Sequence, residues 1–93
     1  MSYELQFHPA ALDEWRKLDH AIRETLKRSL AERLENPRVP ASRLPGGRDR
    51  YKIELRSAGY RLVDEVRDGV LVVPVVAVGR RDRNAVYKAA DRR

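Results

Sequence analysis

The chain has 93 residues, no cysteine and a net charge of +6, so we expect one small domain, residues 1–93, without disulfides. The absence of cysteine also excludes thiolate catalysis, iron–sulfur clusters and thiolate zinc sites. The N-terminus shows no signal-peptide pattern, and the longest apolar run, Val70 to Val78, is too short to cross a bilayer. We therefore expect a cytoplasmic protein that does not contact a membrane.

The positive charge lies in the second part of the chain. Residues 1–36 hold six Lys and Arg against seven Asp and Glu, whereas residues 37–93 hold fourteen against seven. This asymmetry favours a polyanionic partner, which is either a nucleic acid or an acidic protein. Because a basic half also occurs in proteins that bind no nucleic acid, the charge alone leaves both interpretations open.

The first part of the chain predicts one strand and two helices. Residues 3–8 alternate between apolar and polar side chains, as in a strand with one buried face. Pro9 suits the first position of a helix. A second amphipathic helix is expected after Asp19, a suitable N-cap, and it ends at Asn36-Pro37. We expect the two helices to form a hairpin on one face of a sheet.

The second part predicts three strands. A loop rich in proline and glycine spans residues 37–50. Alternation predicts a strand over residues 51–56, and a tight turn leads to another strand over residues 60–67. An Asp-Gly turn then leads to a nearly all-apolar strand over residues 70–79, which we expect at the centre of the sheet.

Two features complete the predicted fold. Pro74 interrupts the apolar strand, so we expect a bulge or a locally unpaired edge there. The polar tail, residues 80–93, is predicted to form a short helix after Asp82. The element order β-α-α-β-β-β defines an α+β fold with an antiparallel sheet, a helix hairpin on one face and a short C-terminal helix.

Basic and aromatic side chains of the second part can gather on one surface of such a sheet. Lys52 and Arg56 share a strand face, and Arg61 follows just across the turn at Gly59. Because both predicted helices lie on one face, the other face is expected to be open. The candidate residues on this basic surface are Lys52, Arg56, Arg61, Arg80, Arg81, Arg83 and Tyr87.

This residue set suits the cleavage of RNA. The 2′-hydroxyl of RNA attacks the neighbouring phosphate when a protein supplies a base, fixed positive charge for the phosphorane and an acid for the leaving 5′-oxygen. Arginine forks suit the phosphorane, and a lysine with a lowered pKa can act as the base. From spacing alone, a solvated basic face or a docking surface for an acidic helix explains the pattern more simply.

No metal or other cofactor is expected. His8 and His20 are predicted to be surface or capping residues, and no carboxylate cluster has the spacing of metal ligands. Trp15, on a helical apolar stripe, is predicted to be a core residue. The chemistry therefore has to come from the basic and aromatic side chains themselves.

The chain resembles the RelE toxins of the RelE/RelB toxin–antitoxin pairs, in the wider RelE/ParE superfamily, from Tyr3 to about Arg92. The resemblance implies a microbial-ribonuclease-like fold and an endoribonuclease that cleaves mRNA in the ribosomal A site. It also implies three partners, namely a RelB-like antitoxin, the ribosome with its mRNA, and operator DNA bound only through the antitoxin. The most specific segments are Tyr51-Lys52-Ile53, Gly59-Tyr60-Arg61-Leu62-Val63 and Val86-Tyr87.

The resemblance also implies roles for individual residues. Lys52 matches a lysine that takes part in acid–base work or holds the phosphate, and Arg61 matches the arginine that stabilises the transition state. Arg81 matches the basic residue proposed as the acid for the leaving oxygen, and Tyr87 matches the tyrosine that stacks on and orients the substrate. The RNA-binding residues expected around them are Arg56, Arg80 and Arg83.

Glu54 departs from the family pattern, because the best-known member has a lysine at this position. Glu54 is either the base, or it pairs with Lys52 or Arg56 and weakens the site by holding up the pKa of the lysine. A glutamate among these cations is expected to have a lowered pKa, which favours a supporting role. Pro45 is a second departure, because the same best-known member has a basic residue at this position.

Two alternative functions remain. One is a ParE-like gyrase inhibitor without chemistry of its own, against which the retention of Lys52, Arg61, Arg81 and Tyr87 argues. The other is a toxin that Glu54 has made inert, and that serves only as an antitoxin-binding partner and corepressor.

Overall fold

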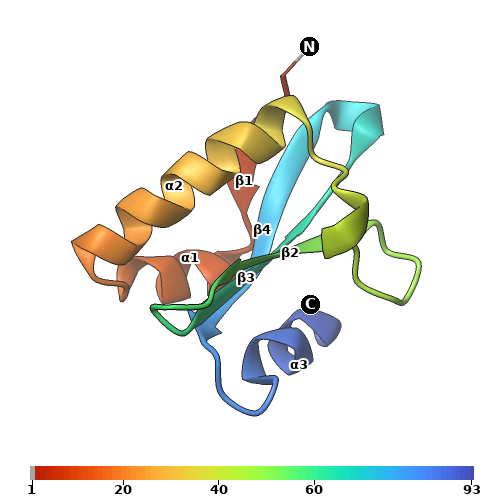
Figure 1. Cartoon of the computed structure of the whole chain (residues 1–93). Coiled ribbons are helices and arrows are strands. Elements are labelled where there is room, and N and C mark those ends of the chain that lie inside the picture. The colour runs from red at the N-terminus through yellow and green to blue at the C-terminus, as the bar shows by residue number, and fades with distance from the viewer. Residues whose placement is uncertain (1) are drawn as a thin grey trace.

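The computed structural model describes residues 2–93, which form a four-stranded sheet with helices on both faces (Figure 1). The α+β class and the order of the elements agree with the sequence-based prediction. The elements are β1 (Glu4–Phe7), α1 (Pro9–Arg16), α2 (His20–Glu35), a 3-10 turn (Pro40–Ser42), β2 (Arg50–Leu55), β3 (Tyr60–Glu65), a second 3-10 turn (Asp68–Val70), β4 (Val72–Arg80) and α3 (Ala85–Asp91).

The sheet has the strand order β1-β4-β3-β2. Strands β2, β3 and β4 form the predicted antiparallel meander, but β1 runs parallel to β4, so the sheet is mixed rather than antiparallel throughout. The helix hairpin explains the direction of β1. It returns the chain to the end where β1 began, as the hydrogen bond from Tyr3 N to Leu34 O (2.8 Å) shows. Strand β2 therefore starts in the direction of β1, and two further reversals leave β4 in that direction too.

The α1–α2 hairpin covers one face of the sheet, as predicted. Its buried Ala11, Trp15, Leu26 and Leu30 pack against apolar side chains of the strands, which makes Trp15 a core residue. His8 caps α1 by accepting the N–H of Ala10 at its Nδ1 (3.1 Å). Helix α2 begins after Asp19, although the Asp19 side chain makes no capping hydrogen bond.

The central strand β4 is irregular near Pro74. A bulge lies at Val76, because Val63 faces Ala77 while the next residue of β3, Asp64, faces Val75. Pro74 faces Gln6 of β1 and lies beyond the last paired residue of the β3–β4 ladder. The predicted irregularity is therefore present two residues after the proline, and the missing N–H of Pro74 removes no bond from that ladder.

The start of β4 differs slightly from the prediction. The Asp-Gly turn is a 3-10 turn over Asp68–Val70, followed by Leu71 in the left-handed region (φ 53°). The strand therefore begins at Val72 instead of Val70, and Val70 is exposed.

The second face of the sheet is not open, contrary to the sequence-based expectation. Figure 1 shows α3 on the side of the sheet opposite α1 and α2, and its Val86 and Ala90 pack against Val63, Val76 and Ala77. The expectation was wrong for this region because the bulged β4 presents apolar side chains to the second face as well, and these need cover from water. Within residues 2–93, no helix is long and apolar enough to cross a membrane.

Candidate active site

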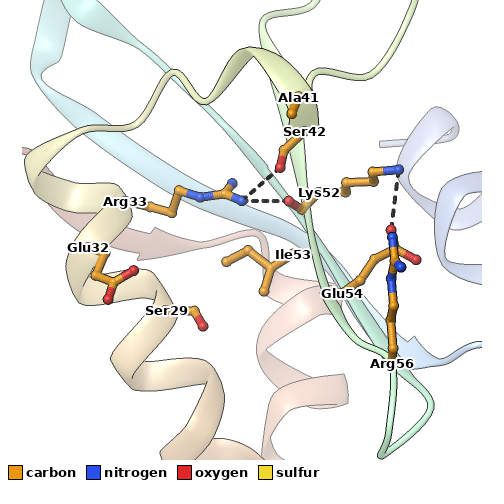
Figure 2. A pocket seen from close by; sticks show the side chains of 9 residues that line it. All are labelled: Ser29, Glu32, Arg33, Ala41, Ser42, Lys52, Ile53, Glu54 and Arg56. Carbon is orange, nitrogen blue, oxygen red and sulfur yellow. Dashed lines mark hydrogen bonds and ion pairs between the residues drawn. The ribbon is translucent and has the colours of Figure 1, made fainter.

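Four of the predicted site residues meet on the α3 face of the sheet. The antiparallel register places Glu54 of β2 opposite Arg61 of β3, so their side chains leave the sheet on the same face. Figure 2 shows Lys52 and Glu54 leaving β2 on the side away from α2. Tyr87 reaches the group from α3, which lies on this face. Two neighbouring strands and a helix from the end of the chain thus build one cluster.

Arg61 is the centre of this cluster. Its guanidinium carbon lies 4.8 Å from the centre of the Tyr87 ring, and its Nη1 donates to Asn84 Oδ1 at 3.0 Å. Its Nε lies 3.5 Å from Glu54 Oε2, and the side chain is only 13% exposed. Glu54 also pairs with Lys52, with 3.3 Å between Nζ and Oε1. Arg61 is therefore held on three sides before any substrate binds.

Glu54 has the lowered pKa that its sequence context predicted. The hydrogen bond from Lys52 is the main cause, and the charges of Lys52, Arg61 and Arg56 act in the same direction, against the opposing effect of burial. The closest cations are Lys52 and Arg61, and not the Arg56 considered from the sequence. Glu54 is therefore ionised at neutral pH and is a weak base.

Arg81 lies at the rim of this cluster. Its backbone N–H donates to Gly59 O at 2.7 Å, and it follows two residues after Gly79, which faces Arg61 across the β3–β4 ladder. The Arg81 side chain is exposed. The backbone therefore fixes the position of the chain at the rim, and the side chain is open to solvent.

The other predicted RNA-binding residues surround the cluster less closely. Arg80 stacks on Tyr60, with 5.3 Å from its guanidinium carbon to the ring centre. Arg83 is exposed in the β4–α3 loop, where its backbone has a φ of 47°. Arg56 is exposed beyond the end of β2, on the same side of the strand as Glu54 (Figure 2), and with Lys52 and Glu54 it lines the cavity between α2 and β2. Arg80 and Arg83 therefore lie outside the compact group around Arg61, whereas the charge of Arg56 acts on its member Glu54.

Two cavities lie beside residues of the cluster. One of about 390 Å³ lies between α2 and β2, where Arg33 reaches from the helix to Ser42 and to the carbonyl of Lys52 (Figure 2). The other, of about 620 Å³, lies between α3 and the loop around Pro45, and Tyr87 and Asn84 form part of its wall. The second cavity adjoins the Arg61 cluster, and it has space for a planar ring beside Tyr87.

Asn84 was missed by the sequence analysis. An asparagine just before a helix suggests an N-cap, but its side chain makes no capping bond and instead accepts from Arg61. Only the tertiary contact reveals this role. Among residues 2–93, no group of three or more His, Asp or Glu side chains is placed to hold a metal ion.

Comparison with known proteins defines the class of this chain. The family model of the ParE toxin of the type II toxin–antitoxin system parDE matches residues 5–85. The mRNA interferase toxin RelE of Escherichia coli strain K12 is 53% identical over 93 residues, covering 100% of this chain and 98% of RelE.

Solved structures agree with the sequence matches. Free E. coli RelE carrying two substitutions superposes with a TM-score of 0.90 at 50% identity, covering 99% of this chain and 97% of that one. A chain of the intact E. coli RelBE toxin–antitoxin complex superposes with a TM-score of 0.84 at 52% identity, covering 88% of this chain and 100% of that one. Fold and sequence together define a type II toxin. The chain belongs to the RelE toxins of the RelE/ParE superfamily, as its sequence motifs indicated.

Proposed function

We propose that this chain is the toxin of a type II toxin–antitoxin system and that it cleaves mRNA in the ribosomal A site. The observation that carries the proposal is the convergence of Lys52, Glu54, Arg61 and Tyr87 on one face, from three elements. The 53% identity with the mRNA interferase toxin RelE supports the same activity over the whole chain.

In the proposed reaction the 2′-hydroxyl of the RNA is the nucleophile. Its oxygen forms a bond to phosphorus, its proton passes to a base, and the bond from phosphorus to the 5′-oxygen breaks as that oxygen receives a proton. Arg61 supplies positive charge to the phosphorane, and its contacts with Glu54, Asn84 and Tyr87 hold it ready, so that little reorganisation is needed during the reaction.

The other residues take roles that suit their positions. Arg81, on the rim, is proposed to act as the acid for the leaving 5′-oxygen. Tyr87 is proposed to stack on a base of the RNA beside the adjoining cavity. Lys52 is proposed to hold the phosphate or to take part in proton transfer. Glu54 is proposed to support the site by holding Lys52 and Arg61, because its lowered pKa makes it a poor acceptor of the hydroxyl proton.

Dependence on the ribosome follows from what the cluster lacks among the described residues. Freestanding ribonucleases of similar fold use a His/Glu acid–base pair, but here His8 caps α1 and His20 begins α2, both away from the α3 face. We therefore expect that the ribosome positions the message and that the isolated chain cuts naked RNA poorly.

The partners follow from family membership and charge. The E. coli relative is known in a RelBE toxin–antitoxin complex, so we propose that a RelB-like antitoxin neutralises this chain in the cytoplasm. The excess of Lys and Arg in residues 37–93 suits an acidic partner. Binding to operator DNA is proposed to occur only through the antitoxin.

Translating ribosomes and purified protein test the activity directly. Primer extension on a defined message is expected to show cleavage in the A-site codon, and the same message without ribosomes is expected to stay largely intact. Arg81→Ala and Tyr87→Ala should each reduce cleavage. Equal cleavage of free RNA would refute the ribosome dependence. Intact messages together with blocked supercoiling by DNA gyrase would point to a ParE-like inhibitor instead.

A further inference from the structure

Helix α3 carries Tyr87 but is too short to hold its own position. It has seven residues, Ala85–Asp91, and the residue before it, Asn84, makes no side-chain capping bond. Isolated helices shorter than about 12–15 residues are only marginally stable in water. Only Val86 and Ala90 of α3 are buried. Side chains from the rest of the molecule must therefore help to fix this helix on the sheet.

Arg50 provides such a contact at the C-terminal end of α3. This arginine begins β2 and is only 7% exposed. Its Nη1 donates to Ala90 O at 2.6 Å, across 40 residues of sequence. Ala90 O also accepts the backbone N–H of Arg93 at 2.9 Å. Carbonyls in the last turn form the negative end of the helix dipole, so a guanidinium is well suited as a second donor at this place.

Glu65 holds Arg50 in the orientation that this contact needs. Arg50 Nε donates to Glu65 Oε1 at 2.9 Å from the neighbouring strand β3. Burial raises the pKa of Glu65, but the hydrogen bonds from Arg67 and Arg50 outweigh burial and keep that pKa below its usual value. The carboxylate is therefore ionised and compensates the charge of a buried arginine, which would be costly if it were unpaired.

Arginines from the sheet thus contact both ends of α3. Arg61 binds Asn84 at the N-terminal end, and Arg50 binds Ala90 at the C-terminal end. Tyr87 lies between these two attachments, with its ring under Arg61. At the same end, Arg48 Nη1 donates to Asp91 O at 3.4 Å, and Arg93, just after the helix, donates to Val76 O at 2.9 Å and pairs with Glu14. The Arg50 side chain is more buried than that of Arg93, so we expect its loss to loosen the second half of α3 and to change the place of the Tyr87 ring relative to Arg61.

We propose that Arg50 is a positioning residue for Tyr87, which it fixes beneath Arg61 by holding the last turn of α3 on the sheet. This inference rests on the proposed cleavage function and assigns a purpose to a residue outside the Arg61 cluster. Arg50 also forms part of the wall of the cavity beside Tyr87. Direct contact with the substrate is therefore the rival explanation that the experiment has to exclude.

The test replaces Arg50 in two ways and in two backgrounds. Arg50→Met keeps the length of the side chain without its donors, and Arg50→Lys keeps the charge but lacks the forked geometry. Both are made in the parent chain and in Tyr87→Ala. Arg38→Ala is the matched control, because it removes an arginine whose ion pairs are with Asp49 and Asp68, both outside α3.

Two quantities are measured, namely the kcat and KM of cleavage on ribosome-bound message, and the hydrogen exchange of backbone amides. We expect Arg50→Met to lower kcat about tenfold or more with a smaller change in KM, since a displacement of about 1 Å at a reacting group can cost a factor of 100. Amides of α3 should exchange faster while those of β3 and β4 keep their protection. Arg50→Lys should recover part of the rate, and Arg38→Ala should match the parent.

The Tyr87→Ala background separates the two explanations. If Arg50 acts through Tyr87, then Arg50→Met lowers kcat no further in that background. An undiminished loss there means that Arg50 acts on the substrate itself, and it overturns the inference. Parent-like cleavage and parent-like exchange in both Arg50 variants overturn it as well. A parent chain that leaves ribosome-bound messages intact refutes the proposed function, and with it the catalytic purpose of Arg50.

Discussion

The two faces of the sheet hold their helices by different means. On the first face, α1 and α2 bury large apolar side chains such as Trp15, Leu26 and Leu30 against the strands. On the second face, the buried apolar cluster is small and contains only valine and alanine, among them Val86 and Ala90 of α3. Hydrogen bonds from Arg50 and Arg61 supplement this cluster.

This difference suggests a division of labour. Apolar burial provides most of the folding free energy in a small domain, and here it is concentrated on the α1–α2 face. The α3 face can therefore carry the charged side chains of the Arg61 cluster, which contribute less to folding. Changes on the first face should mainly alter stability, and changes on the second face should mainly alter cleavage.

The largest expected effect concerns Asp64, a charged residue buried within the apolar face. Burial raises its pKa from 3.8 to about 7, and Arg33, with 3.9 Å between Nη1 and Oδ2, only partly opposes this shift. Both carboxylate oxygens lack a hydrogen-bond partner within the described residues. A pKa raised on folding stabilises the fold fully below pH 4, and this contribution is lost as the pH rises towards 7.

Asp64→Asn should therefore remove a pH dependence. Between pH 4 and pH 8, the free energy of unfolding of the parent should fall relative to the variant by on the order of 4 kcal/mol. Urea unfolding at several pH values measures this difference. Asp68→Asn is a control of opposite sign, because the lowered pKa of Asp68 makes its contribution appear as the pH rises. A constant difference between the parent and Asp64→Asn would contradict the buried, ionisable state of Asp64.

The next prediction compares how much the two faces contribute to the free energy of unfolding. Leu26→Ala, at a fully buried position of α2, should lower the free energy of unfolding by about 2–5 kcal/mol. Val86→Ala on α3 should cost about 1–2 kcal/mol, because it removes less apolar surface. Denaturant unfolding of both variants checks the order. Equal losses would show that the two faces contribute alike.

Arg61→Ala should have the opposite effect, with a large loss of cleavage and a small loss of stability. Cleavage of ribosome-bound message should fall about 100-fold, or about 2.7 kcal/mol in the barrier, as for the loss of one preorganised donor to a developing oxyanion. The free energy of unfolding should change by only about 1 kcal/mol. Arg23→Ala is the matched control, because Arg23 hydrogen-bonds the Leu18 carbonyl within the helix hairpin. Retained cleavage in Arg61→Ala would remove the centre of the proposed site.

The smallest expected effect is that of Glu54→Gln. As a support for Lys52 and Arg61, Glu54 should contribute less than about tenfold to kcat, whereas loss of a general base costs about 100-fold to 10,000-fold. Because the pKa of Glu54 is lowered, its contribution is present above that pKa and should be lost only as the pH falls through it. Between pH 5 and pH 8 the ratio of the two rates should therefore stay constant, and rate measurements over this range check both its size and its constancy.

Glu54→Lys restores the family residue and tests the hypothesis of an inert toxin. If the parent chain and Glu54→Lys both cleave ribosome-bound message, Glu54 is compatible with activity. If only Glu54→Lys cleaves, the parent chain serves as an antitoxin-binding partner, and the proposed activity is wrong for this sequence.

The sequence by itself determined the local structure and much of the chemistry. Periodicity and turn residues predicted the order of the elements, the helix hairpin on one face and the irregularity near Pro74. The pattern of charges also predicted the lowered pKa of Glu54. These predictions succeed because the helical and strand periods show directly which side of each element is buried.

Only the tertiary structure decided how the elements meet. The parallel direction of β1 depends on the number of chain reversals that separate it from β4, and the cover of the second face depends on where α3 folds back. The pairing of Glu54 with Arg61 and the bond from Arg50 to Ala90 join residues on different elements. Periodicity shows which face needs cover, but it does not show which distant segment supplies it, because such contacts form only once the whole chain has packed.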